Sequence, residues 1–186
     1  MRINEDMILY HGSYTIVEKP ELSKCRKGKD FGKGFYLTSS KSQAERFTKT
    51  AIRKAVLDGI IQDGTKVGYV SKYRVKSISE LEIYDFKYAD DEWLHCVVGH
   101  RKKNSLPDEC DKWKSFDVIS GKIANDNTNL VITAYMDGVY GEVGSKRADT
   151  IAIGFLEPQN LKDQFCFRTE KAISILEYIG NERVMI

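Results

Sequence analysis

The chain has 186 residues, of which 41% are hydrophobic and 30% are charged, and its net charge is +2. This length and composition are typical of one globular domain, which we expect to cover residues 1–186. The nearly balanced charge argues against a protein dedicated to nucleic acid or to a membrane surface. No apolar run approaches the roughly 18 residues that a membrane span needs, so no membrane partner is expected.

The cysteines and histidines follow no metal-binding spacing. The cysteines form no CxxC pair and the histidines no HxxxH pattern, so we expect free thiols and no bound metal. These residues are Cys25, Cys96, Cys110, Cys166, His11, His95 and His100. The first residues, MRINEDMILY, lack the long apolar core of a signal peptide. The sequence therefore predicts a cytoplasmic protein.

The first 38 residues predict two short strands separated by a basic loop. A strand over 8–11 ends in a histidine, and the loop CRKGKDFGKG (25–34) precedes a strand over 34–38. A phosphate-binding loop would need GxxxxGK, then Ser or Thr, at the start of a helix, whereas a strand follows here. Taken alone, this loop is typical of a flexible basic turn.

The next segments predict a long helix and a strand. Residues 39–59 have helical periodicity, Ser42 and Glu45 fit a capping box, and Gly59 fits the end of the helix. In 65–75 the apolar and aromatic residues alternate with polar ones, which is typical of a half-exposed strand with one buried face.

The second half of the chain predicts a mixed series of strands and helices. We expect strands over 81–86, 116–124 and 163–169, a polar turn at 125–127, and helices over 91–102, 128–138, 146–157 and 169–180, the last capped by Thr169. Trp93 and Trp113 are expected in the core. Because no regular βαβ repeat occurs, the order favours an α+β fold.

Two segments resemble the ADP-ribosyltransferases of the poly(ADP-ribose) polymerase and diphtheria-toxin class, whose signature is H-Y-E. YHGS (10–13) resembles the segment that carries the histidine, and FGKGFYLTSSKSQAERF (31–47) resembles the one that carries the tyrosine. A second aromatic follows that tyrosine by eleven residues in the family, as Phe47 follows Tyr36 here. The resemblance implies a split-sheet α+β fold, with two facing antiparallel sheets and NAD in the cleft between them.

The same resemblance implies roles for individual residues. His11 would hold a ribose hydroxyl, and the backbone of Gly12 would pair with the nicotinamide carboxamide. Ser13 would offer a hydroxyl, while Tyr36 and Phe47 would stack on the nicotinamide ring. Each role has a structural alternative, because a histidine at a strand end is often only hydrogen-bonded and both aromatics could belong to the core.

The basic loop corresponds to the family's donor loop over the pyrophosphate of NAD. Lys33 is the cation that we expect there, with Lys27 and Lys29 beside it in the same loop. Positive charge near two phosphates is physically favourable.

The third signature position differs from the family. Its glutamate opens a late strand, and the counterpart here is Gln164 in DQFCF (163–167). A glutamine can orient a ribose hydroxyl, but it has no ionisable carboxyl and cannot act as a general base. The difference speaks against the synthesis of ADP-ribose chains and favours mono-ADP-ribosylation.

The chain also resembles a bacterial domain family of unknown function over most of residues 8–178. The shared segments are LYHGS, DFGKGFYLT, FDVISGKIANDN and QFCFRTEKAI. This family has glutamine at the third signature position. The resemblance implies a bacterial or phage origin and a toxin or defence setting, with an antitoxin or immunity protein as partner.

Transfer of ADP-ribose from NAD to a protein or nucleic acid, with release of nicotinamide, is therefore the expected activity. Two alternatives remain open at this point. One is an inactive module that binds NAD or ADP-ribose, which the missing glutamate favours. The other is a transferase of the same fold that acts on nucleic acid. It is indicated by four basic side chains on the predicted helix: Arg46, Lys49, Arg53 and Lys54.

Overall fold

The computed structural model describes residues 2–102, 105–106, 111–123, 126–156 and 161–186. Seven strands and five α-helices occur in this part of the chain, together with one short 3-10 helix. In chain order they are β1 (Ile8–Ser13), η1 (Leu22–Lys24), β2 (Phe35–Leu37), α1 (Lys41–Leu57), β3 (Val67–Val75), β4 (Ile83–Asp85), α2 (Asp91–Arg101), β5 (Val118–Lys122), α4 (Asp126–Met136), α5 (Lys146–Leu156), β6 (Asp163–Phe167), α6 (Glu170–Ser174) and β7 (Leu176–Met185). The fold is mixed α+β, as the sequence predicts.

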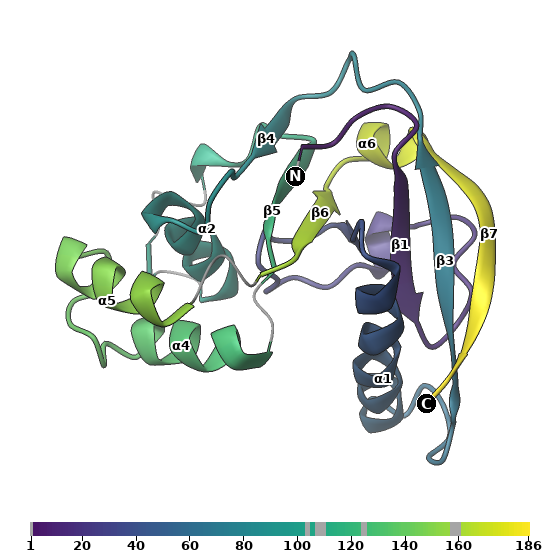
Figure 1. Ribbon diagram of the computed structural model, residues 1–186, viewed down its shortest axis with the longest axis horizontal. Helices are drawn as coiled ribbons and strands as arrows, with labels where there is room; N and C mark the ends of the chain where they lie inside the picture. Colours follow the sequence, from purple (N-terminus) through teal and green to yellow (C-terminus); the bar gives the residue numbers. More distant parts are fainter. Residues whose placement is uncertain (1, 103–104, 107–110, 124–125, 157–160) are drawn as a thin grey trace.

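The strands form two sheets. One has the order β1-β3-β7 and is antiparallel throughout. The other has the order β2-β6-β5-β4, and its β4–β5 pair is parallel, so the expectation of two purely antiparallel sheets is wrong for this edge. A bridge between Tyr10 and Thr38 joins the sheets through two backbone hydrogen bonds of 2.8 and 3.0 Å. Figure 1 shows the two sheets side by side, with β1, β3 and β7 in one and β4, β5 and β6 in the other.

Two hydrophobic cores flank the four-stranded sheet. Alternate residues of β6 point to opposite faces, and Phe165 and Phe167 belong to the core between the sheets. Cys166, between them in the sequence, belongs to the core under α2, α4 and α5, which also contains the fully buried Trp93 and Trp113. The prediction that both tryptophans are core residues is confirmed. Gln164, two positions from Cys166, therefore lies on the face toward these helices.

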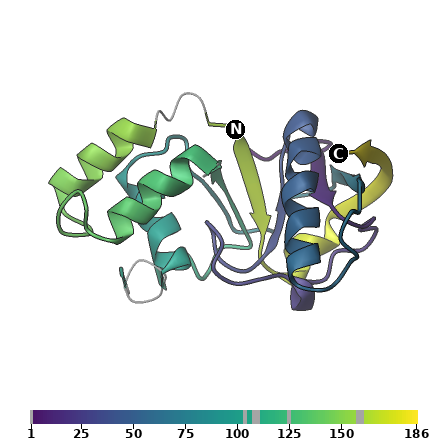
Figure 2. The ribbon, with the colours of Figure 1, turned by 90° about the horizontal axis from the view of Figure 1, so that it is seen from below.

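Helix α1 packs against the three-stranded sheet through one face. Ala44, Thr48, Ile52 and Ala55 are its buried residues, at helical spacing. The predicted capping box is wrong, because the helix begins at Lys41 with Ser40 as its N-cap and no side chain caps it. Figure 2 shows α1 along this sheet, with α4 and α5 on the far side of β6.

The C-terminal helix is shorter than the sequence pattern indicates. Thr169 caps α6 as predicted, accepting a hydrogen bond from the backbone N of Ala172 at 3.1 Å, but the helix ends at Ser174. The segment from Leu176 is a strand, because β3 offers it a full-length partner. Cross-strand contacts such as the Tyr73–Tyr178 ring pair, 6.0 Å between centroids, stabilise the sheet over the local helix preference.

Two smaller expectations are also corrected. β3 is not buried on one face alone, because Val70 and Ser71, which point to opposite faces, are both buried and Tyr69 is not. Ser71 Oγ accepts a hydrogen bond from the backbone N of Val17 at 3.0 Å, so the segment after β1 covers that face. The second expectation is the polar turn at 125–127. Residues 126 and 127 are instead the first residues of α4, and residue 125 lies outside the described residues. None of the described helices is both long enough and apolar enough to cross a bilayer.

Candidate functional site

A cleft of about 1310 Å³ lies between α1 and β1 on one side and the ends of α2 and α4 on the other. It is larger than the roughly 300–1,000 Å³ of ordinary small-molecule pockets. Six of the seven site residues expected from the sequence line it: His11, Gly12, Ser13, Tyr36, Phe47 and Gln164. They come from β1, β2 and α1, which follow one another within the first 57 residues, and from β6, which the sheet order brings beside β2.

His11 is half-buried at the cleft and is held in one orientation. Its Nδ1 donates a hydrogen bond to the backbone oxygen of Tyr36 at 2.9 Å, and its ring lies 4.5 Å from the ring of Phe35 between centroids. A carbonyl oxygen only accepts, so the neutral ring carries its proton on Nδ1 and keeps Nε2 as an acceptor. Loss of solvation lowers the pKa of His11, which favours this neutral form.

Gly12 brings β1 and α1 unusually close together. A Cβ atom at this position would lie 2.0 Å from the backbone oxygen of Ala44, so no other residue fits without a shift of the helix. The N–H and C=O groups of alternate strand residues point to the same edge. The N–H and C=O groups of Tyr10 bond Thr38 at the outer edge of β1. The same groups of Gly12 point to that edge too, and they have no backbone partner among the described residues. A planar amide could pair with that free edge.

Tyr36 lines the cleft, and its hydroxyl is engaged within the protein. The hydroxyl donates to the backbone oxygen of Gly32 at 2.8 Å and accepts from the backbone N of Phe31 at 2.9 Å. Burial raises its pKa well above the usual value, so the phenol stays protonated. The side chain therefore fixes the end of the glycine-rich loop against β2 while the residue lines the cleft.

Phe47 is not a core residue. It is 46% exposed, whereas the buried face of α1 carries smaller side chains. It shares the cleft-lining face of α1 with Gln43, Thr50 and Lys54, at helical spacing. An exposed phenylalanine in a cleft presents an apolar ring to a ligand.

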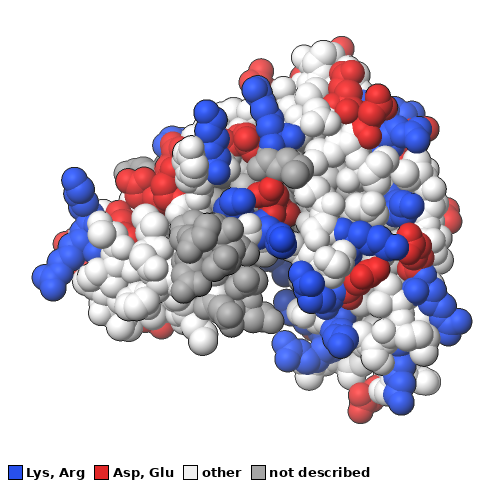
Figure 3. All heavy atoms as spheres, viewed as in Figure 1, with Lys and Arg blue, Asp and Glu red and all other residues white. Residues whose placement is uncertain are grey.

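The cleft is rich in cations, but Lys33 is not among its lining residues. Lys33 is exposed on the glycine-rich loop. The cations that do line the cleft include Lys29, Arg46, Arg53 and Lys54. Burial lowers the pKa of Lys29, and the nearby charge of Lys54 lowers it further, so an anion bound here would relieve the repulsion. Figure 3 shows Lys and Arg side chains beside this hollow.

Ser13 and Gln164 are buried residues of the cleft wall. Ser13 Oγ accepts a hydrogen bond from the backbone N of Thr15 at 3.4 Å. Gln164, 7% exposed, donates from Nε2 to Asp30 Oδ2 at 2.7 Å and to the backbone oxygen of Lys122 at 3.2 Å. Its Oε1 has no hydrogen-bond partner among the described residues, so it is available to a ligand.

Asp30 and Arg101 are cleft residues that the sequence patterns do not single out. The Arg101 guanidinium donates from Nε and Nη2 to Asp30 Oδ1, at 2.9 and 2.6 Å. The only available signal is that Asp30 is the one acid within the basic loop CRKGKDFGKG. Its partners lie 71 and 134 residues away, and no local pattern reports such contacts.

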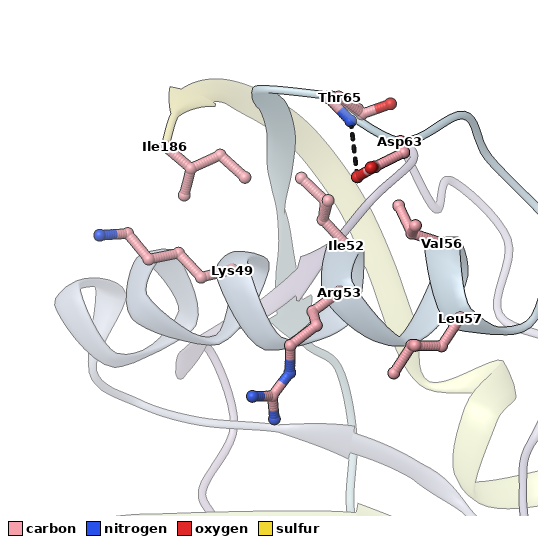
Figure 4. A pocket seen from close by; sticks show the side chains of 9 residues that line it. Lys49, Ile52, Arg53, Val56, Leu57, Asp63, Thr65 and Ile186 are labelled. Atoms are coloured by element: carbon pink, nitrogen blue, oxygen red, sulfur yellow. Dashed lines mark hydrogen bonds between the residues drawn. The ribbon is translucent and has the colours of Figure 1, made fainter.

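A second hollow of about 600 Å³ lies at the C-terminal end of α1, away from the expected site residues. Apolar side chains of Ile52, Val56, Leu57 and Ile186 line it, beside a turn in which Asp63 accepts a hydrogen bond from the backbone N of Gly64 at 2.9 Å (Figure 4). Lys49, Arg53, Asp63 and Thr65 also line it, but none of the residues expected from the sequence to form the site does.

The described residues contain no cluster of three or more His, Cys, Asp or Glu that could hold a metal ion. Cys25 and Cys166 form no disulfide in the described part of the chain, and Cys110 lies outside the described residues. His95 bonds Asp149 at 3.1 Å and Asp149 also accepts from Tyr135, in a buried network within the helical half.

Comparison with known proteins gives one family. No curated protein matches the chain. Residues 7–178 match the model of a family described as protein of unknown function (DUF3990). This match spans almost the whole chain and includes every residue of the cleft discussed above. The chain therefore belongs to the DUF3990 family.

Proposed function

We propose that the chain is an NAD-dependent ADP-ribosyltransferase with the split-sheet fold of the H-Y-E class and a glutamine at the third position. The observation that carries the proposal is the meeting of His11, Tyr36 and Gln164 in one cleft, although each comes from a different strand. The order of the two sheets and the bridge between Tyr10 and Thr38 support the same fold.

The chemistry of the cleft suits the parts of NAD. The acceptor atoms His11 Nε2 and Gln164 Oε1 can receive hydrogen bonds from ribose hydroxyls. The free strand edge at Gly12 can pair with the carboxamide, and the exposed ring of Phe47 can stack on the nicotinamide. The cations beside Lys29 can neutralise the pyrophosphate.

In the proposed reaction, the bond between ribose C1′ and the nicotinamide nitrogen breaks, and its electron pair leaves with neutral nicotinamide. A nucleophile of the acceptor attacks the positively charged ribose at C1′ and gives its proton to water. The chain's residues hold the ribose, orient it and limit access of water, so no enzyme nucleophile is needed. Gln164 takes no proton in this scheme.

The direct test is incubation with NAD, with and without bacterial lysate, followed by measurement of free nicotinamide and of acceptor mass. We expect nicotinamide release, and a mass increase of one ADP-ribose on the acceptor. The matched variant His11→Ala should release about 10–100-fold less, since it loses one or two hydrogen bonds to the ribose. Failure of the wild-type protein to bind NAD would remove the proposal.

A module that binds NAD or ADP-ribose without turnover is the second candidate. The observation in its favour is that Gln164 supplies no ionisable group to the cleft. Calorimetry with NAD separates the two: binding without nicotinamide release, with every acceptor fraction of the lysate, supports the module. Arg46, Arg53 and Lys54 line the cleft, so nucleic acid is one acceptor fraction to include.

A further inference from the structure

Gln164 lies in a buried chain of three polar side chains. Arg101, from the last turn of α2, donates two hydrogen bonds to one oxygen of Asp30, and Gln164 donates to the other oxygen. Asp30 is only 8% exposed, and all three residues line the cleft. A carboxylate so far from water needs such partners, because an unpaired buried charge is strongly disfavoured.

This arrangement fixes which way the amide of Gln164 points. Asp30 Oδ2 at 2.7 Å and the backbone oxygen of Lys122 at 3.2 Å are both acceptors, so only the NH₂ end of the amide can face them. The carbonyl oxygen Oε1 is left on the other side. It accepts from no residue in the described part of the chain and is the polar atom that Gln164 offers to a ligand.

We propose that Asp30 is a positioning residue, which acts through Gln164 by holding its amide so that Oε1 faces the ligand as a neutral acceptor. The inference rests on the proposed function, in which that oxygen receives a ribose hydroxyl. The glutamine is then matched to Asp30, and it is not the remnant of a lost glutamate. The carboxylate that the third signature position lacks is present one hydrogen bond away.

A glutamate at position 164 is incompatible with this arrangement. Two carboxylates would lie within about 3 Å of each other and share one guanidinium, so one of them would have to hold a proton. A carboxylate oxygen would also face the backbone oxygen of Lys122. Among the described residues, the other charged or titratable groups near this site include Lys29, Tyr36, Cys166 and the ammonium group of Lys122, which pairs with Asp163 at 2.9 Å.

The test is an exchange of the two functional groups. The variants are Gln164→Glu, Asp30→Asn and the double variant Asp30→Asn/Gln164→Glu, with Gln62→Glu as a matched control that adds an exposed carboxylate. Each is melted without ligand at about pH 5 and about pH 8, on either side of the range in which a proton would leave the carboxyl pair. Each is also assayed for nicotinamide release.

We expect Gln164→Glu to lower the melting temperature by about 5–10 °C at the higher pH. The loss should be smaller at the lower pH, because the folded carboxyl pair binds a proton there. The double variant should regain at least half of the loss, since the amide introduced at position 30 can donate to the carboxylate introduced at position 164. Nicotinamide release should fall about 10–100-fold in Gln164→Glu and recover in the double variant. Gln62→Glu should change neither readout.

The outcomes separate this inference from the proposed function. If the effects of Gln164→Glu and Asp30→Asn on the melting temperature simply add in the double variant, Asp30 is not a positioning residue. The same follows if either single variant releases nicotinamide at the wild-type rate. If the melting temperatures show the coupling but the wild-type protein neither binds NAD nor releases nicotinamide, the orientation of Gln164 is supported and the proposed function is overturned.

Discussion

The imidazole of His11 is bonded through Nδ1 to the backbone oxygen of Tyr36, at 2.9 Å. The bond runs from β1 to β2, 25 residues along the chain, close to the bridge between Tyr10 and Thr38. The prediction that the first strand ends at His11 is wrong, because β1 continues to Ser13 and stays paired with β3. The bond therefore sets both the tautomer of His11 and the distance between the two sheets at this point. The histidine is therefore a hydrogen-bonded structural residue and also lines the cleft, so the structural and the ligand-binding interpretations of its position are compatible.

The pKa of His11 leads to the first prediction. Since burial lowers it from 6.5, the ring should be neutral at pH 7, and its NMR titration should lie below that of a free histidine. The unfolded chain binds more protons than the folded one below about pH 6.5. The stabilising contribution of the neutral ring is thus present above that pH and is lost as the pH falls through the folded pKa. The rate of nicotinamide release should fall over the same acidic pH range.

His100 contributes to the same loss of stability at acidic pH, because burial lowers its pKa too. The variant His11→Ala separates the two contributions: its melting temperature should depend less on pH below about 6.5 than that of the wild-type protein. A His11 resonance that titrates at or above the ordinary value would contradict the neutral acceptor.

Phe47 gives the second prediction. Because it is 46% exposed, Phe47→Ala should weaken NAD binding by about 10-fold through loss of a stacking face while changing the unfolding free energy by less than about 0.5 kcal/mol. Leu57→Ala is the matched control, since Leu57 lies on the same helix, is 79% exposed and is outside the cleft lining. Calorimetry and thermal melting of both variants check this. Equal NAD affinity in the two variants would show that Phe47 does not touch the ligand.

Much of the site could be predicted from the sequence because its signals are local. The histidine on the first strand, the aromatic on a short strand and the aromatic on the following helix each lie in a short continuous motif, and His11, Tyr36 and Phe47 all line the cleft. The exposure of Phe47 could not be predicted, because periodicity alone also fits a core position. Which of its faces α1 buries depends on the close approach at Gly12.

The errors have non-local causes. Residues 176–180 continue the predicted helix, but they belong to β7, because β3 supplies a partner strand more than a hundred residues earlier in the chain and cross-strand pairing prevails. The contact of Asp30 with Gln164 spans 134 residues. The sequence therefore indicates a glutamine without a carboxylate, whereas the fold brings a carboxylate to it.

Gly12 gives the third prediction. A Cβ atom there would lie 2.0 Å from the backbone oxygen of Ala44, so Gly12→Ala should destabilise the protein by several kcal/mol, on the order of an overpacked core. Gly154→Ala is the control, because a Cβ atom in α5 at Gly154 meets no atom of the described residues within 4 Å. That change should stabilise the protein by about 0.5–1 kcal/mol. Denaturant unfolding of both variants measures the contrast, and a stable Gly12→Ala protein would show that α1 can move.

The last prediction concerns the cations of the glycine-rich loop. Lys29 lines the cleft and Lys33 does not, although both are basic residues of one loop and the resemblance favours Lys33. Lys29→Ala should therefore weaken NAD binding by about 5–10-fold at low salt, and Lys33→Ala by less than about 2-fold. Because the pKa of Lys29 is lowered by burial and by Lys54, a bound pyrophosphate should raise it, so NAD binding should take up protons at high pH. Calorimetry in buffers of different ionisation enthalpy measures that uptake, and the Lys29→Ala variant should lack it. If Lys33→Ala is the weaker binder, the pyrophosphate lies on the outer face of the loop and the cations of the cleft serve another ligand.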